Sequence, residues 1–301
     1  MSTLCENTEG IAMGIKTILV PIDGSKGSFA ALSRAFIVAE RFGSHIKALH
    51  VMTHGADITA AGTYNLPAKL RKSVEGKADK LALERAAELQ EFFEGHCLDN
   101  DIPISKKPVK QGGVTAVWHQ EFGTVDDVLI HHGRVSDVIA VPRPKLKKGV
   151  MRRSPMGRAI EAILLRTGRP VLIEPPKSNV KKCSRVVLGW NDSVECSRAL
   201  AMTMPWLVGM GEITVLVSKK RKSSVKALVE YLSWYDIKAN IVILDGKGKT
   251  IGEGMLKVCS ELSADFLIVG GFSHARAREL LFGGVTRHLL MHSNIVTIMT
   301  H

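Results

Sequence analysis

Two glycine pairs near the C-terminus could hold a negatively charged group. Gly270-Gly271 follows the apolar run "FLIV" (266–269), and Gly283-Gly284 precedes a segment whose apolar residues have helical spacing. Between the pairs lies the arginine-bearing stretch "FSHARARELLF". Glycines let the backbone approach an anion closely, and the first amides of a helix can donate hydrogen bonds to it. The same pattern also fits an ordinary tight connection, because glycines are common in turns.

Other residues with metal-binding or catalytic chemistry do not form complete motifs. His288 and His292 are four apart on a predicted helix, but they lack the glutamate of H-E-x-x-H and a third ligand. His131 and His132 are sequence neighbours that point in different directions from a helix, which favours solvent exposure or core packing. Cys259 lies on an apolar helical face, which favours the core. No G-x-S-x-G motif and no evident carboxylate pair indicates a hydrolase.

An internal repeat organises the elements around these residues. The segments 16–52 and 184–218 both contain an apolar strand, a polar turn with serine, an alanine-rich helix, a glycine turn and a second strand. Asp23 in the first turn corresponds to Asn191 in the second. A period above about 100 residues is too long for a solenoid and indicates a duplicated domain.

Each repeat contains five apolar strands that alternate with helical segments. This alternation predicts an α/β fold: two tandem doubly wound, Rossmann-like domains with five-stranded parallel sheets, at 14–176 and 183–301. The folded pattern begins only at Lys16, so translation could start at either Met1 or Met13. The strands are expected near 17–21, 46–52, 104–109, 137–141 and 170–174, and near 185–190, 212–218, 239–244, 266–270 and 294–299.

The connection between the second and third strands differs most between the repeats. In the first repeat it contains a long helical segment from Pro67 to Cys97, and its counterpart in the second repeat is much shorter. Apolar residues at helical spacing predict one buried stripe along this segment. The stripe consists of Val74, Ala78, Leu81, Leu89 and Phe92.

Several stretches resemble the universal stress protein family, in its tandem form with two domains in one chain. They are "TILVPIDGS" (17–25), "ALHVM" (48–52), "LIVGGFSHARARELLFGGVTRHLL" (267–290) and "NIVTIM" (294–299). The resemblance covers nearly everything from Lys16 onward. It implies the strand order 3-2-1-4-5 and self-association of the domains through their final strands, as an internal pseudo-dimer. Such pairing would cover strand edges that would otherwise be open.

The resemblance also implies an adenine nucleotide site in the second repeat, for ATP or ADP with or without Mg²⁺. Nucleotide-binding members carry G-x2-G-x9-G-[ST] after the fourth strand. Gly270 and Gly283 fit this signature, whereas Ser273 and Gly284 depart from it. By resemblance, Asn191 would meet the ribose or base, and the backbone near Ser218 would meet adenine. The candidate nucleotide-binding residues are Asn191, Ser218, Gly270, Ser273, Gly283, Gly284 and Val285.

The position of these residues in the predicted sheet supports a site independently. Ligands of doubly wound sheets bind outside the carboxyl ends of the strands, where the strand order reverses. Asn191 follows the first strand of the second repeat and Gly270 ends the fourth, so both would face this crevice. In the first repeat, Pro142 and Pro144 follow the fourth strand and cannot donate backbone hydrogen bonds. We therefore expect one nucleotide per chain, with the first repeat as a structural domain.

Composition limits the compartment and the partners. The net charge is +12, but the basic residues gather at predicted connections without interleaved aromatic residues, which favours solvated loops over a specific nucleic-acid groove. No apolar run approaches the roughly 20 residues that span a bilayer, so no membrane partner is expected. Five cysteines without a C-x-x-C pair indicate reduced thiols in a cytoplasmic protein.

Three functions fit these observations. The first is a stress-response regulatory protein in which occupancy by ATP or ADP changes assembly or partner choice. The second is a nucleotide-free scaffold or interaction module of the same fold. The third is a slow ATP hydrolase, which is less favoured because no general base or metal-binding carboxylates are evident near the glycine loop. An enzyme is therefore not the preferred interpretation.

Overall fold

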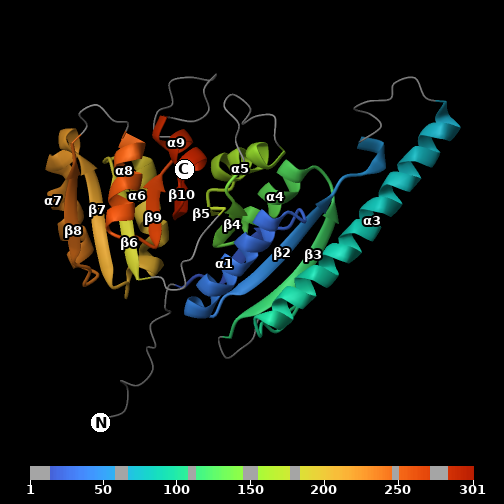
Figure 1. Cartoon of the computed structure of the whole chain (residues 1–301), viewed down its shortest axis with the longest axis horizontal. Helices are drawn as coiled ribbons and strands as arrows, with labels where there is room; N and C mark the ends of the chain where they lie inside the picture. Colours follow the sequence, from blue (N-terminus) through green and yellow to red (C-terminus); the bar gives the residue numbers. More distant parts are fainter. Residues whose placement is uncertain are drawn as a thin grey trace, which may run out of the picture.

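The computed structural model is an α/β protein in which helices pack on one large sheet (Figure 1). It describes residues 14–57, 67–107, 113–144, 155–176, 184–245, 251–271 and 284–301. Ser273 and Gly283 of the candidate site, and the linker 177–183, lie outside these ranges.

Ten strands of the described chain form one sheet in the order β3-β2-β1-β4-β5-β10-β9-β6-β7-β8. All neighbouring strands run parallel except β5 and β10, which pair antiparallel. Each half of the sheet thus has the order 3-2-1-4-5, and the halves meet through their final strands, as predicted. The first half contains β1 (Thr17–Pro21), β2 (His45–Met52), β3 (Thr115–Phe122), β4 (Val138–Pro142) and β5 (Val171–Glu174). The second half contains β6 (Arg185–Trp190), β7 (Glu212–Ser218), β8 (Ala239–Leu244), β9 (Phe266–Gly270) and β10 (Val296–Thr300).

Helices cover both faces of the sheet and create two apolar layers. One layer contains buried residues of α1 (Lys26–Phe42), α3 (Ala68–Asp99), α6 (Val194–Leu207) and α7 (Val225–Ser233). The other contains buried residues of α4 (Val125–Arg134), α5 (Pro155–Arg166), α8 (Ile251–Glu261) and α9 (Gly284–His292). A short 3-10 helix, η2 (Lys219–Ser224), directly follows β7. Because both faces are covered, β4 and β10 are buried at every residue and their sequences are nearly continuous apolar runs.

The predicted third strand of the first half, at 104–109, is wrong. The strand is β3, Thr115–Phe122, and Ile104 makes only an isolated bridge to Ala116. β3 is one of the two edge strands of the sheet, with β8 at the other edge, and its sequence, "TAVWHQEF", is mostly half-buried. Its second half, "HQEF", is largely polar, so its hydrophobic signal is weaker than that of β8, "ANIVIL".

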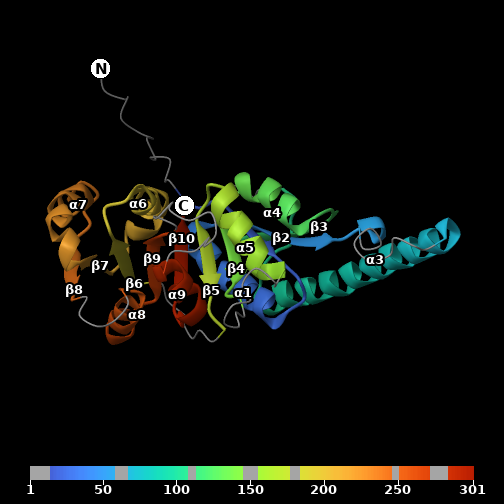
Figure 2. The same ribbon diagram turned by 90° about the horizontal axis from the view of Figure 1, so that it is seen from above.

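The predicted buried stripe of the long helix is also largely wrong. Leu89 is buried, but Val74, Leu81 and Phe92 are 38%, 64% and 65% exposed. In both views the N-terminal part of α3 extends past the end of the sheet (Figure 1, Figure 2). The residues that α3 buries belong to a neighbouring face of the helix, at i, i+3, i+7 and i+11 spacing. They are Ala86, Leu89, Phe93 and Cys97.

Polar contacts reinforce the junction between the two halves of the sheet. Thr297 and Ile298 of β10 pair with Ile173 and Leu172 of β5. Arg143, directly after β4, donates from Nη1 to the carbonyl oxygen of Met291 in α9 over 2.6 Å. Since β5 and β10 each have a neighbour on both sides, neither offers an edge to a second chain.

Candidate functional site

A cavity of about 540 Å³ lies at the carboxyl ends of the second-half strands. It opens where β6 is flanked by β7 on one side and β9 on the other, so the strand order reverses there. Its volume falls in the range of small-molecule sites, roughly 300–1,000 Å³. The described lining residues are Gly189, Trp190, Asn191, Cys196, Leu216, Ser218, Lys220, Arg221, Leu244, Ile251, Met255, Val269, Gly270, Gly284, Val285 and Thr286.

The cavity brings together most of the residues that the sequence predicted. Asn191 lies directly after β6, and Ser218 and Gly270 end β7 and β9. Gly284 and Val285 form the first turn of α9. The folded chain therefore gathers these five residues from three connections, as expected for a crevice at the strand ends.

The side chain of Asn191 stabilises the turn that contains it. Its side-chain Oδ1 accepts a hydrogen bond from the backbone N–H of Ser193 over 3.1 Å. Ser193 in turn caps α6 by accepting from the N–H of Cys196. Asp23 makes the same contact with Ser25 in the first half, at 2.9 Å. The matching residues of the internal repeat thus form the same type of turn.

A Cβ added at either of two cavity glycines, Gly270 or Gly284, would meet different surroundings. A Cβ at Gly270 would lie 2.5 Å from the backbone nitrogen of Cys196, so the end of β9 can approach the start of α6 only with glycine. A Cβ at Gly284 would meet no described atom within 4 Å. The cavity therefore has open space at the N-terminus of α9, where the helix dipole favours an anion.

The charged lining of the cavity was missed by the sequence reasoning. Lys220 and Arg221 of η2 line it, and none of the described lining residues is acidic. Trp190, another lining residue, donates from Nε1 to Ser224 Oγ over 3.1 Å, which ties the end of β6 to the end of η2. The basic stretch "KKRK" had been interpreted as a solvated loop. Its position directly after a parallel strand was the signal that could have placed it at the crevice.

The corresponding position in the first half is filled by the chain itself. Pro142 ends β4 as Gly270 ends β9, and a Cβ at Gly27 would lie 2.9 Å from the Cβ of Pro142. A Cβ at Gly24 would meet Arg85 Nη2 at 2.5 Å and Leu89 at 2.9 Å, because α3 packs over this turn. Protein side chains thus lie close to the turn that precedes α1.

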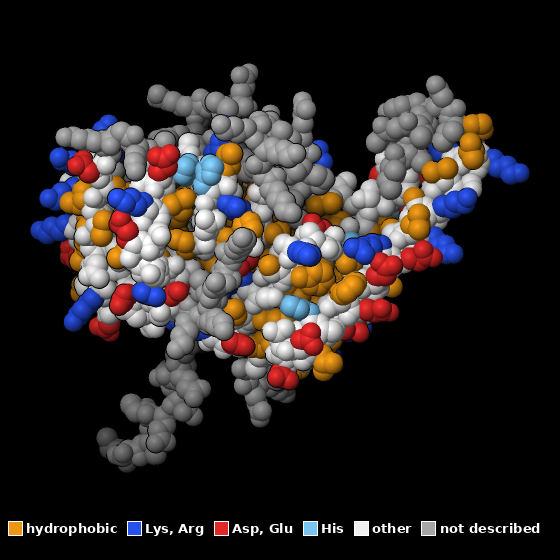
Figure 3. Space-filling view, viewed as in Figure 1, with side chains coloured by type: hydrophobic (Ala, Val, Ile, Leu, Met, Phe, Trp, Pro, Cys, Tyr) orange, Lys and Arg blue, Asp and Glu red, His pale blue; other side chains and the backbone are white. Residues whose placement is uncertain are grey.

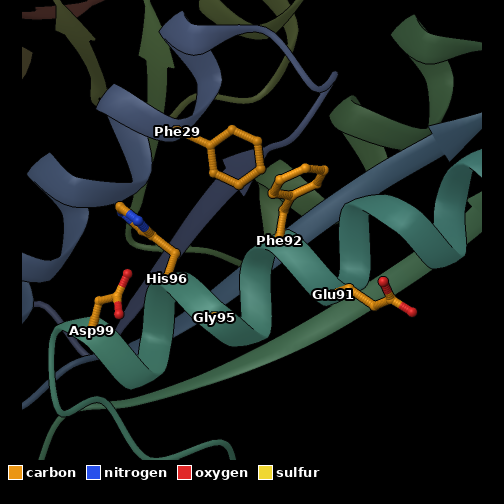
Figure 4. Close-up of a pocket in the computed structure, with 6 residues that line it drawn as sticks. All are labelled: Phe29, Glu91, Phe92, Gly95, His96 and Asp99. Atoms are coloured by element: carbon orange, nitrogen blue, oxygen red, sulfur yellow. The ribbon is translucent and has the colours of Figure 1, made fainter.

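A smaller hollow of about 430 Å³ lies between α1 and α3 (Figure 4). Phe29 faces Phe92 with ring centroids 6.3 Å apart, and His96 Nε2 lies 2.8 Å from Ser33 Oγ. Burial lowers the pKa of His96, and Asp99 opposes this shift. None of the predicted site residues lies here.

Three side chains form a polar cluster at the other end of the molecule. His132 Nε2 lies 2.7 Å and His119 Nε2 lies 3.5 Å from the same carboxylate oxygen, Oε2 of Glu121. The hydrogen bond with His132 lowers the pKa of Glu121, while burial lowers the pKa of His132. The sequence reasoning missed this cluster because it placed the third strand before His119.

The three described cysteines, Cys97, Cys196 and Cys259, are all buried, and burial raises the pKa of two of them. Cys259 is fully buried, as predicted, and burial raises its pKa to about 12. Burial likewise raises the pKa of Cys97 to about 12. Because the thiolate is the reactive form, neither residue is suited to nucleophilic chemistry near neutral pH.

The sheet and the cavity define a doubly wound α/β protein with a ligand-sized crevice at the carboxyl ends of its strands. A sequence model of the universal stress protein family matches residues 14–173, slightly more than half of the chain, and the chain therefore belongs to this family. The match covers the first half, whereas the candidate cavity lies in the second. No helix among the described residues combines the length and the apolarity that crossing a bilayer requires.

Solved structures share the fold over nearly the whole chain. A universal stress protein from Archaeoglobus fulgidus is 18% identical with a TM-score of 0.63, covering 94% of this chain and 97% of its own. A protein of unknown function from Pseudomonas aeruginosa PAO1 is 12% identical with a TM-score of 0.52, covering 96% and 93%. A putative universal stress protein from P. aeruginosa UCBPP-PA14 is 12% identical with a TM-score of 0.50, covering 96% and 94%. No curated protein sequence matches the chain significantly.

Proposed function

We propose that the protein is a regulatory nucleotide-binding protein that takes up one ATP or ADP in the second half of the chain. The observation that carries the proposal is the 540 Å³ cavity at the reversal of strand order, where Asn191, Ser218, Gly270, Gly284 and Val285 meet. Family membership supports the same conclusion. We further propose that the chain divides into domains at 14–176 and 183–301 and works in the cytoplasm.

The proposed roles follow from the chemistry of the lining. The first turn of α9, at Gly284 and Val285, would present backbone amides to phosphate oxygens. Lys220 and Arg221 would supply positive charge to the same anion. The polar groups of Asn191 and the backbone near Ser218 would meet the nucleoside, against apolar walls that include Leu216, Val269 and Met255.

Occupancy without rapid turnover fits this lining best. The described lining residues include no carboxylate or histidine that could activate water. Any Mg²⁺ would enter with the nucleotide phosphates. A slow ATP hydrolase is therefore the weaker alternative, and a nucleotide-free interaction module is the other.

The test is release and rebinding of the ligand. Purified full-length protein is denatured, the released small molecules are identified by chromatography and mass spectrometry, and the stripped protein is titrated with ATP and ADP by calorimetry. We expect an adenine nucleotide, one site per chain, and little hydrolysis during the titration. Two equivalent sites per chain would contradict the proposal that only the second half binds nucleotide. If neither ATP nor ADP binds, a nucleotide-free interaction module is favoured instead.

A further inference from the structure

The cluster of His119, Glu121 and His132 has the composition of a metal site. His119 and Glu121 are two residues apart on β3, so their side chains leave the same face of the strand. His132 reaches them from the last turn of α4. The side chains of His119 and Glu121 are 43% and 41% exposed and that of His132 is 11% exposed. Two elements thus place three ligating groups together at the edge of the sheet.

We propose that these three residues bind a divalent transition-metal ion with the preferences of Zn²⁺. Their ligand atoms all lie within 4.8 Å of one another, and two separations are 2.7 and 3.5 Å. Zinc bonds of 2.0–2.2 Å in a tetrahedron place ligand atoms about 3.3 Å apart, so small side-chain rotations would suffice. The ion would replace the proton now shared by Glu121 and His132. A water molecule would complete the tetrahedron at the exposed edge.

The donor set also decides which ion fits. Two imidazole nitrogens and one carboxylate oxygen suit Zn²⁺ and its neighbours in the first transition row, whereas Mg²⁺ and Ca²⁺ prefer oxygen ligands throughout. Lys47 acts electrostatically on His132 and would oppose a cation. We therefore expect micromolar rather than nanomolar affinity, with a marked loss when any one ligand is removed.

The test uses Zn²⁺ alone, with Co²⁺ as a spectroscopic probe, on chelator-treated full-length protein. Calorimetry should give one Zn²⁺ per chain, no saturable Mg²⁺ uptake, and intense visible absorption of Co²⁺ typical of a tetrahedral site. Glu121→Gln and His132→Ala should each weaken Zn²⁺ binding by at least the roughly tenfold that loss of an outer-shell partner costs. His131→Ala, at the adjacent exposed histidine, is the matched control and should bind normally.

Zn²⁺ binding at another pair of histidines must be distinguished from binding at the proposed site. His288 and His292 on α9 have ring centroids 4.6 Å apart and could bind Zn²⁺ weakly as a pair. His288→Ala should leave the strong site unchanged. If His288→Ala abolishes Zn²⁺ uptake while His132→Ala does not, or if wild-type protein takes up no Zn²⁺ at micromolar concentrations, the proposal is overturned.

A different observation, on α3, carries a second inference. Leu70, Val74, Leu81 and Phe92 lie near one line along this helix and are all exposed. The space-filling view shows hydrophobic side chains along α3 between charged ones (Figure 3). The helix therefore carries an apolar stripe that the described part of its own chain does not bury.

The charges on α3 are divided between its two ends. Residues 69–80 contain five basic and two acidic side chains, whereas residues 84–99 contain one basic and five acidic. The helix dipole is positive at the N-terminus and negative at the C-terminus, so this distribution is unfavourable within one helix. It is favourable between two antiparallel copies, because each basic half would lie beside an acidic half.

We infer that the stripe is covered by α3 of a second copy of this chain, packed antiparallel about a two-fold axis near Leu81. This axis sets Leu70 of one copy opposite Phe92 of the other, and Leu81 opposite itself. An isologous contact of this kind uses one surface twice and closes as a dimer. The opposite charges of the two ends of α3 favour the antiparallel alignment, and the stripe supplies the apolar area that the dimer would bury.

Sedimentation of the full-length protein at micromolar concentrations tests this inference. We expect a dimer for the wild type, a monomer for Leu81→Glu, and a dimer for Trp234→Glu, which changes an exposed apolar residue beyond α7. Lys77 flanks the stripe, so Lys77→Glu should also weaken the dimer. Adding Glu84→Lys and Glu88→Lys on the same side of α3 should restore the dimer, because the ends are again complementary. A monomeric wild type, or a dimer that Leu81→Glu leaves intact, would overturn the inference.

Discussion

The guanidinium of Arg34 and the carboxylate of Glu174 form a buried ion pair, with Nε 2.8 Å from Oε2. Arg34 lies on α1 and Glu174 ends β5, so the pair fastens the first helix to the strand that joins the two halves. A second hydrogen bond, from Nη2 to Oε1 at 3.4 Å, gives the pair two points of contact.

Glu174→Ala should strongly destabilise the protein. The change leaves the Arg34 charge buried beside a small apolar side chain, and breaking such pairs costs about 3–5 kcal/mol of unfolding free energy. Urea denaturation followed by circular dichroism measures this loss. Glu261→Ala is the control, because Glu261 pairs with Lys257 on the surface, and it should cost less than about 1 kcal/mol. Equal effects of the two changes would contradict this account.

Gly270→Ala and Gly284→Ser should have opposite consequences. The new Cβ at position 270 would press on the backbone of Cys196, which we expect to cost about 1–3 kcal/mol of stability. A side chain at position 284 enters open space, and a serine hydroxyl there would add a hydrogen-bonding group beside the anion site. Gly284→Ser should therefore fold normally and bind ATP as tightly as the wild type or more tightly. Thermal unfolding and ATP titration measure the two effects separately.

Replacing the cations of η2 should weaken nucleotide binding without unfolding the protein. Lys220→Gln and Arg221→Gln each remove one positive charge from the cavity lining. If each side chain makes one hydrogen bond to phosphate, its loss costs about 1.5–3 kcal/mol, or more than tenfold in affinity. Lys219→Gln is the matched control, because Lys219 is the adjacent exposed lysine outside the lining. Calorimetry at two salt concentrations should show a smaller salt dependence only for the first two variants.

Much of the fold could be predicted because buried parallel strands have simple sequences. β1, β6, β7 and β8 lie at the expected residues. The repeat correctly predicted two halves, and the family resemblance correctly predicted that they join through β5 and β10. β3 was missed because its second half is largely polar, whereas β8, the other edge strand, is a nearly continuous apolar run. The buried face of α3 was misassigned because the helix has apolar residues on two faces, and only tertiary contacts distinguish them.

The candidate site, like the fold, was predicted only in part from the sequence. Asn191 and Gly270 were predicted to lie at one crevice because they follow or end neighbouring strands, and Ser218 was predicted from the family resemblance; all three line the cavity. Lys220 and Arg221 were missed because their approach depends on the path of η2. The histidine–glutamate cluster required the correct residues of β3, since only then do His119 and Glu121 share a face with His132 nearby.

Acidification should destabilise the protein below about pH 6.5. Burial lowers the pKa of His45, His96 and His288 in the folded state below the ordinary histidine value of 6.5. The unfolded chain therefore binds protons first, and the stability present above pH 6.5 is lost as the pH falls towards the lowered values. Urea midpoints on either side of this range measure the loss. His96→Gln keeps hydrogen-bonding ability but cannot titrate, so it should reduce the pH dependence; an unchanged dependence would contradict this assignment.

Cutting the linker should not separate the two halves. A protease site inserted between residues 177 and 183 would break the chain outside the described strands of the sheet. The β5–β10 ladder and the hydrogen bond from Arg143 to Met291 would remain. The cut protein should still elute as one species, at the same volume as the uncut protein. Arg143→Met removes the hydrogen bond and should lower the urea concentration at which the cut halves part. Halves that separate at once in native buffer, each as a soluble monomer, would show that the final strands do not hold the molecule together.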